Sequence, residues 1–176
     1  MSPVPEDQTL APWKGLQETL AGSFVARARG LLATDFALMD PESREIGRLR
    51  IYGPEGAALE AGELEARIEH TAPRCYAMLA GGARILSAKT AGSPDAMQIR
   101  CAEHVYEARL TLLRNTAEAI SPAGERAARV AGGLTNRRYE AAFDADDAGS
   151  LPVAVFLLYR LVALRRGAYR VGAGGG

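Results

Sequence analysis

The chain has 176 residues, and its 21 lysines and arginines balance its 21 aspartates and glutamates, so the formal net charge is zero. This length corresponds to one domain that buries enough surface to form its own hydrophobic core. The zero balance argues against a protein that coats nucleic acid, because non-specific nucleic-acid binding depends on net positive charge, and we expect no nucleic-acid partner.

The first 22 residues are predicted to form an arm and a short helix outside the main domain. Residues 1–12 carry three prolines among polar residues, which predicts an irregular arm. Residues 13–22 place Trp13, Leu16 and Leu20 at helical spacing, which predicts an amphipathic helix ended by Gly22. The arm has no basic stretch followed by an apolar one, as a secretory signal would, so we expect a cytoplasmic protein.

From about residue 23 onward, apolar and polar residues alternate with period two, as in strands that have one wet face. The clearest runs are residues 64–70, 97–101, 104–112 and 138–143. Turn signals rich in glycine, proline and aspartate separate the runs, at residues 40–43, 53–56, 81–82, 92–95, 121–124 and 132–133. This regular spacing predicts a meandering antiparallel sheet.

Two of the predicted hairpins have related sequences. Residues 38–49 (LMDPESREIGRL) align with residues 119–130 (AISPAGERAARV), and each segment has a proline in its turn. One interpretation is two ordinary hairpins, since Asp-Pro and Ser-Pro favour turn initiation. The other is a duplicated half-barrel.

Residues 151–166 are predicted to form a helix that is apolar on every side and must therefore be enclosed. The 14 residues from 151 to 164 are interrupted by Arg160, whereas a bilayer span needs about 20 apolar residues. A run this short is typical of a buried core helix. Ser150 is expected to cap the helix, Pro152 to lie in its first turn and Gly167 to end it, leaving residues 168–176 as a flexible tail.

Because the rest of the chain reads as strands, we expect the enclosing structure to be a sheet that closes on itself. The predicted fold is mainly β (α+β), a closed antiparallel β-barrel over residues 23–167 around a central C-terminal helix. The predicted core of that helix is Val153, Phe156, Leu157, Arg160, Leu161 and Leu164. Arg160 needs a partner if it is buried: we expect a structural ion pair, with an anionic ligand or an exit to the rim as alternatives.

The order of these elements resembles the superfamily of tubby C-terminal, LURP-one and phospholipid-scramblase domains. The resemblance covers roughly residues 30–166, and it rests on the runs 36–53, 64–70 and 76–90 and on a late apolar helix after residues 139–147. It implies a barrel of about twelve strands around a hydrophobic helix. It also implies no enzyme activity, no catalytic residues and no cofactor.

Known functions in this superfamily suggest what such a barrel binds. Tubby domains bind phosphoinositides through basic surface residues, and scramblases are membrane proteins that respond to calcium. By resemblance, we expect a non-enzymatic module that binds an anionic phospholipid headgroup, with peripheral membrane contact, or a protein partner. The alternatives are a scramblase-like protein tethered by its C-terminal helix, and a small-ligand carrier or enzyme that uses a barrel cavity.

Basic residues near strand ends provide a hypothesis for the lipid-binding surface. The candidates are Arg44, Arg48, Arg50, Arg137 and Arg138. Because they alternate with Glu42, Glu45 and Glu140, a mixed, solvated surface is the competing interpretation.

The acidic turn before the last helix is a weak candidate for calcium binding through Asp144, Asp146 and Asp147. Asp144, Asp146 and Gly149 match positions one, three and six of a calcium loop, but positions five and twelve lack the required oxygen ligands. The competing interpretation is favourable charge at a helix N-terminus. No zinc site is expected, because His70, His104, Cys75 and Cys101 lack close ligand spacing, and two cysteines are too few for a disulfide scaffold, so both are expected to be free thiols.

Overall fold

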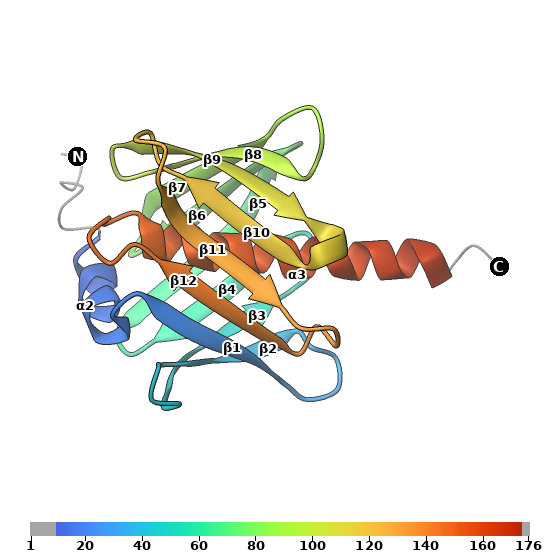
Figure 1. Cartoon of the computed structure of the whole chain (residues 1–176), viewed down its shortest axis with the longest axis horizontal. Helices are drawn as coiled ribbons and strands as arrows, with labels where there is room; N and C mark the ends of the chain where they lie inside the picture. The colour runs from blue at the N-terminus through green and yellow to red at the C-terminus, as the bar shows by residue number, and fades with distance from the viewer. Residues whose placement is uncertain (1–9, 174–176) are drawn as a thin grey trace.

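The computed structural model describes residues 10–173, with side chains to residue 166, as a closed barrel of twelve strands with two helices (Figure 1). The elements are α2 (Ala11–Leu20), β1 (Ser23–Arg29), β2 (Asp35–Met39), β3 (Glu45–Ile51), β4 (Gly56–Ala61), β5 (Leu64–Ala72), β6 (Cys75–Ala80), β7 (Ala83–Thr90), β8 (Ala96–Cys101), β9 (His104–Thr111), the 3-10 turn η1 (Leu112–Arg114), β10 (Thr116–Ile120), β11 (Arg126–Gly132), β12 (Arg138–Phe143) and α3 (Ser150–Ala173). The predicted fold class is confirmed.

Every strand pairs antiparallel with its neighbours in sequence, and β1 also pairs with β12, so that Phe24 lies opposite Ala141. This last pairing closes the sheet and leaves no unpaired strand edge, which removes a site for aggregation. The period-two pattern matches the two faces of the wall. In β5, Leu64 and Ile68 are buried while Glu65 and Arg67 are exposed.

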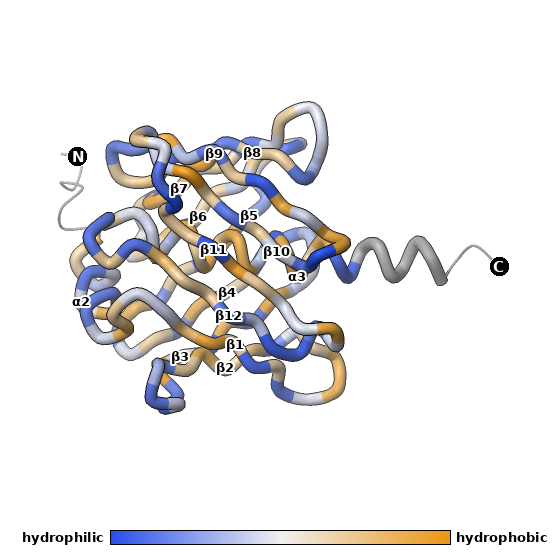
Figure 2. Tube along the Cα trace, in the orientation of Figure 1, coloured by the Kyte–Doolittle hydropathy of each residue, from blue (hydrophilic) through white to orange (hydrophobic). Residues whose placement is uncertain are grey.

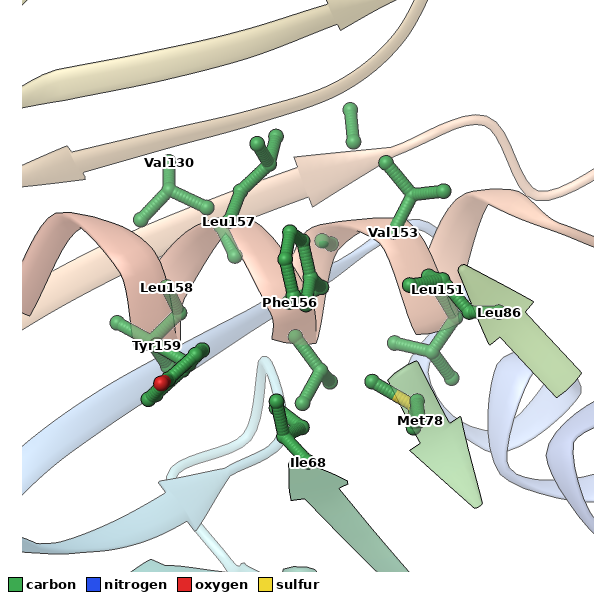
Figure 3. Packing of buried hydrophobic residues seen from close by; sticks show 14 of the residues in the cluster. Ile68, Met78, Leu86, Val130, Leu151, Val153, Phe156, Leu157, Leu158 and Tyr159 are labelled. Atoms are coloured by element: carbon green, nitrogen blue, oxygen red, sulfur yellow. The ribbon is translucent and has the colours of Figure 1, made fainter. Parts of the chain in front are cut away.

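Helix α3 runs through the centre of the barrel (Figure 1), and all its residues from Ser150 to Ala163 are buried. Figure 3 shows why a helix apolar on all sides fits here: Phe156 lies near Ile68 and Met78 of the wall, while Leu157 lies on the side of Val130. Of the predicted core residues, Leu164 is half-buried and the others are buried. The helix takes the place that a lipid or solvent-filled lumen would otherwise occupy.

The predicted limits of α3 are wrong at both ends. Ser150 is not a cap but the first helical residue, and its buried hydroxyl donates hydrogen bonds to the carbonyls of Asp144 and Asp147. Gly167 does not end the helix, which continues to Ala173, because a glycine inside a helix costs only about 1 kcal/mol. The predicted tail is therefore helical over residues 168–173, and residues 174–176 lie outside the described part.

The N-terminal helix also differs from its predicted limits. It begins at Ala11, because a proline at position 12 is compatible with the first turn of a helix. Ala21, rather than Gly22, adopts the left-handed conformation that ends it, with φ of 53°. Residues 1–9 of the predicted arm lie outside the described part of the chain.

Helix α2 covers one end of the barrel, where Trp13, Gln17 and Leu20 are buried. We call this the capped end, and we call the end at which α3 leaves the barrel the exit end. Because every strand reverses direction, the connections alternate between the two ends. Connections that follow odd-numbered strands lie at the exit end, and those that follow even-numbered strands lie at the capped end.

The two hairpins with related sequences share a bulge. The register shifts between Leu38 and Met39 in one hairpin and between Ala119 and Ile120 in the other, at aligned positions. The first strands of these hairpins are β2 and β10, which are eight strands apart, whereas two equal halves of a twelve-stranded barrel would repeat after six. This spacing favours two ordinary bulged hairpins over a duplicated half-barrel.

Candidate functional site at the exit end

The five predicted lipid-binding arginines do not form one patch. Arg44 lies in a connection at the capped end, Arg48 and Arg50 lie along β3, and Arg137 and Arg138 lie at the exit end. Sequence proximity to turns suggested a cluster because it did not distinguish the two ends of the barrel.

Three of these arginines already contact carboxylates. Arg44 Nε lies 3.0 Å from Asp40 Oδ2, and Arg138 forms an ion pair with Glu140 at 3.2 Å. Arg48 contacts both carboxylate oxygens of Asp35, and these contacts hold the pKa of Asp35 below its usual value. The mixed, solvated interpretation therefore describes most of this set.

The large apolar side chains that are exposed lie at the exit end instead. Among the described residues they are Leu31, Leu32, Tyr52, Leu113 and Leu134, with exposed fractions from 66% to 100%. We call these five residues the exit ring. They belong to the connections β1–β2, β3–β4, β9–β10 and β11–β12. These four connections are consecutive around the barrel, so the exit ring lies along one arc of its rim. Figure 2 shows hydrophobic positions on connections at this end.

Charge also differs between the two ends. The connections at the capped end carry one arginine, Arg44, and eight carboxylates: Asp40, Glu42, Glu63, Glu103, Glu125, Asp144, Asp146 and Asp147. The connections at the exit end carry three arginines and two carboxylates: Arg74, Arg114, Arg137, Glu55 and Asp95. Arg165 and Arg166 add two further cations where α3 leaves the barrel. The molecule is therefore electrically polar along the barrel axis.

Arginines at the end of the buried part of α3 hold the backbone of these connections. Arg165 Nε donates to Asn136 Oδ1 at 2.8 Å, and its guanidinium also donates to the carbonyl of Leu112. Arg166 donates to the carbonyl of Leu32. Three loops that carry exit-ring residues are thus tied to one helix, while their apolar side chains point to solvent.

Asparagine and arginine side chains complete this support. Asn115 is buried, and its amide donates to Gly133 O at 3.1 Å and to Asn136 Oδ1 at 3.0 Å, which links two neighbouring loops. Arg137 donates to Gly30 O at 2.7 Å, which links a third. Ordered backbone with exposed tips is what a preformed binding surface requires, because little ordering entropy remains to be lost on binding.

Arg160 is buried, as predicted, but the predicted ion pair is wrong: none of the ion pairs among the described residues involves it. Its guanidinium carbon lies 4.3 Å from the centroid of the Tyr76 ring, so the partner is an aromatic face. His70 stacks on the same ring at 4.9 Å. The preceding helical residue, Tyr159, donates to Pro54 O at 3.0 Å, and burial raises its pKa to about 12.

The acidic turn at the capped end is used mainly by protein donors. The Asp147 carboxylate accepts hydrogen bonds from the Tyr106 hydroxyl at 2.8 and 2.9 Å and from the Gly149 amide at 3.0 Å. Asp144 Oδ1 accepts the amide of Asp146. No three metal-ligating side chains gather anywhere in the described part, so the calcium hypothesis gains no support from the geometry.

The residues considered for a zinc site lie at opposite ends of the barrel. His104 lies at the capped end, 3.7 Å from Asp147, and Cys101 is buried beneath it, whereas His70 and half-buried Cys75 lie near the exit end. Among the described residues, neither cysteine forms a disulfide.

Among the described residues, neither of two surface grooves gathers chemically reactive side chains. The larger, of about 750 Å³, lies over the hairpins β4–β5 and β6–β7 at the capped end and is lined by Pro12, Glu60, Glu63, Glu65 and Arg67, among others. The smaller, of about 290 Å³, lies along β1 and β12. Helix α3 occupies the centre of the barrel, where a carrier or a barrel enzyme would hold its ligand.

Within residues 10–173, no helix combines the length and the apolar character needed to cross a bilayer. No protein-family model matches the sequence, and no curated protein matches it either. The structure is similar to that of a protein from Arabidopsis thaliana, with a TM-score of 0.55 and 9% sequence identity, over 81% of this chain and 93% of that chain. At this identity the similarity concerns the fold alone.

Proposed function

We propose that this chain is a non-enzymatic barrel module, related to the tubby and LURP-one domains, that binds the anionic headgroups of a phospholipid surface through its exit end. The observation that carries the proposal is the opposite composition of the two barrel ends. Arginines and exposed apolar residues lie at the exit end, and carboxylates dominate the capped end.

This polarity predicts an orientation as well as an affinity. Near an anionic membrane surface, each arginine contributes about 1 kcal/mol of attraction that falls off within a Debye length. The carboxylates at the capped end are repelled by the same surface. The field therefore turns the exit end toward the lipid before contact, even though the net charge of the chain is zero.

The proposal moves the lipid-binding surface away from the patch suggested by the sequence. Of the five arginines in that patch, Arg137 alone lies in an exit-end connection. The exit-end arginines Arg74 and Arg114 were missed, because single arginines beside turns carry no pattern in the sequence.

The alternatives have weaker support. A scramblase-like tether would require α3 to leave the barrel, and the strands would then lose the partner of their buried faces. A carrier or enzyme would need an interior that α3 already fills. A protein partner at the exit end is supported by the exposed leucines, and it is an outcome of the experiment below.

The proposal is tested by sedimentation with vesicles of phosphatidylserine and phosphatidylcholine, compared with pure phosphatidylcholine, at two salt concentrations. We expect binding that needs the anionic lipid and weakens with salt. Changing Arg74, Arg114 and Arg137 to glutamate should abolish it. The matched control changes Arg67, Arg84 and Arg100 to glutamate, since these arginines are exposed on strands β5, β7 and β8 of the wall, outside the exit-end connections, and give the same change in net charge.

Equal loss in both triple variants would show only an effect of net charge and would contradict the proposed site. Failure of the wild type to bind any vesicle would contradict the proposed function and leave a protein partner as the surviving candidate.

A further inference from the structure

We infer that the exit ring inserts below the phospholipid headgroups, so that the barrel meets the bilayer with its exit end. This inference rests on the proposed function and adds a mode of binding to it: apolar insertion in addition to charge attraction.

Exposure of the exit ring is unfavourable in water unless something covers it. Leu31, Leu113 and Leu134 are each at least 97% exposed, and elsewhere in the described residues such large apolar side chains are buried or half-buried. Clustered exposed apolar residues mark surfaces that meet a protein or a membrane. The arc formed by the exit ring is thus a contact surface in need of a partner.

The shape of this surface fits a bilayer better than a protein. The apolar side chains lie on four separate connections that project around the point where α3 leaves the barrel (Figures 1 and 2). A fluid bilayer deforms around separate projections, whereas a protein would need a matching set of pockets and a passage for the helix.

The order of residue types along two of the four tips supports the same partner. Arg114 directly follows Leu113, and Arg137 follows three residues after Leu134. Apolar side chains at the tip with arginines behind them match the layers of a membrane surface, in which phosphates lie above the hydrocarbon.

The first test changes Leu113 and Leu134 to serine together. Binding to vesicles that contain phosphatidylserine should weaken about tenfold, equivalent to about 1.4 kcal/mol, while the melting temperature stays unchanged because both side chains are exposed. The matched control is Ala123→Leu, which adds an exposed leucine in a connection at the capped end and should not increase binding.

The second test measures depth with lipids brominated on the acyl chains. The natural Trp13 is fully buried at the capped end, so vesicles should leave its fluorescence unchanged. A tryptophan placed at the tip by Leu113→Trp should be quenched strongly. Trp13 thus serves as a reference within the same molecule.

The outcomes separate this inference from the proposed function. If the arginine variants lose binding while the serine variants bind like the wild type, and Leu113→Trp is not quenched, insertion is wrong and headgroup binding stands. If the wild type binds no vesicles, both are wrong. Quenching of Trp13 as strongly as of the introduced tryptophan would contradict contact through the exit end.

Discussion

The two ends of the barrel are built from the same kind of antiparallel connection but handle their polar and apolar groups in opposite ways. At the capped end, Gln17 Nε2 donates to the carbonyls of Asp144, Ala145 and Asp147 at 2.7 to 3.2 Å, and Trp13 is buried. At the exit end, hydrogen bonds hold the backbone while leucines face water.

The two ends therefore have different roles: the capped end contributes to folding stability, and the exit end is available for recognition. Interactions that are already satisfied, as at the capped end, contribute to folding and leave little to offer a partner. Apolar side chains left exposed on anchored loops contribute nothing to folding and are available for binding.

The largest effect is expected from a charge in the helix that supports both ends. Leu157→Asp places a carboxylate among fully buried neighbours, and we expect loss of the folded state, because the penalty rivals the whole stability of a domain of this size. The matched control is Leu134→Asp at the exit end, which is 98% exposed and should change the free energy of unfolding by no more than about 0.5 kcal/mol. Thermal melts followed by circular dichroism measure both, and a cooperative melt of Leu157→Asp would show that α3 is not the core.

A smaller effect is expected at the capped end itself. Trp13→Ala removes a fully buried indole from beneath α2 and should lower the free energy of unfolding by about 3–5 kcal/mol. Leu113→Ala at the exit end should leave it nearly unchanged. Urea unfolding measures the pair, and similar values for the two variants would remove the distinction between the ends.

The smallest effect concerns pH. Backbone amides and the side chain of Arg44 hydrogen-bond to Asp40 and hold its pKa below the usual value, so its charged form stabilises the folded state. That contribution is complete above the ordinary carboxyl pKa of about 4 and is lost as the pH falls through the lowered value.

Asp40→Asn should therefore be less stable than the wild type at pH 7, with a gap that narrows below about pH 4. Glu103→Gln, also at the capped end but exposed, is the matched control. The measurement is the melting temperature as a function of pH, and a gap that stays constant on acidification would contradict the role assigned to Asp40.

The barrel could be predicted from the sequence because its signals are repeated and local. Alternation in residues 64–70 and 138–143, turn residues at regular spacing, and a helix apolar on all sides each require the same architecture. The partner of Arg160 could not be predicted. Which wall residue lies next to Arg160 depends on the position of α3 along the barrel axis, and this position places the Tyr76 ring beside the guanidinium.

The candidate site was missed for a related reason. A leucine such as Leu113 or Leu134 in a turn reads as one apolar residue without periodicity. Its position at the exit end becomes clear once the strands have been counted, because alternate connections lie at the same end of the barrel. The signal available in the sequence was that large apolar residues occur only in every second connection. This signal can be recognised only when all twelve strands have been assigned.

Helix α3, which fills the barrel, follows all twelve strands in the sequence. This order determines when the barrel can complete its core during synthesis on the ribosome. All twelve strands are translated before residues 150–163, so a nascent chain that has just completed β12 carries inward side chains with nothing to close upon. Folding into the final state must wait until residues 150–163 have been translated. A message truncated before residue 150 would yield a chain of strands with exposed apolar side chains, which would depend on chaperones or be degraded.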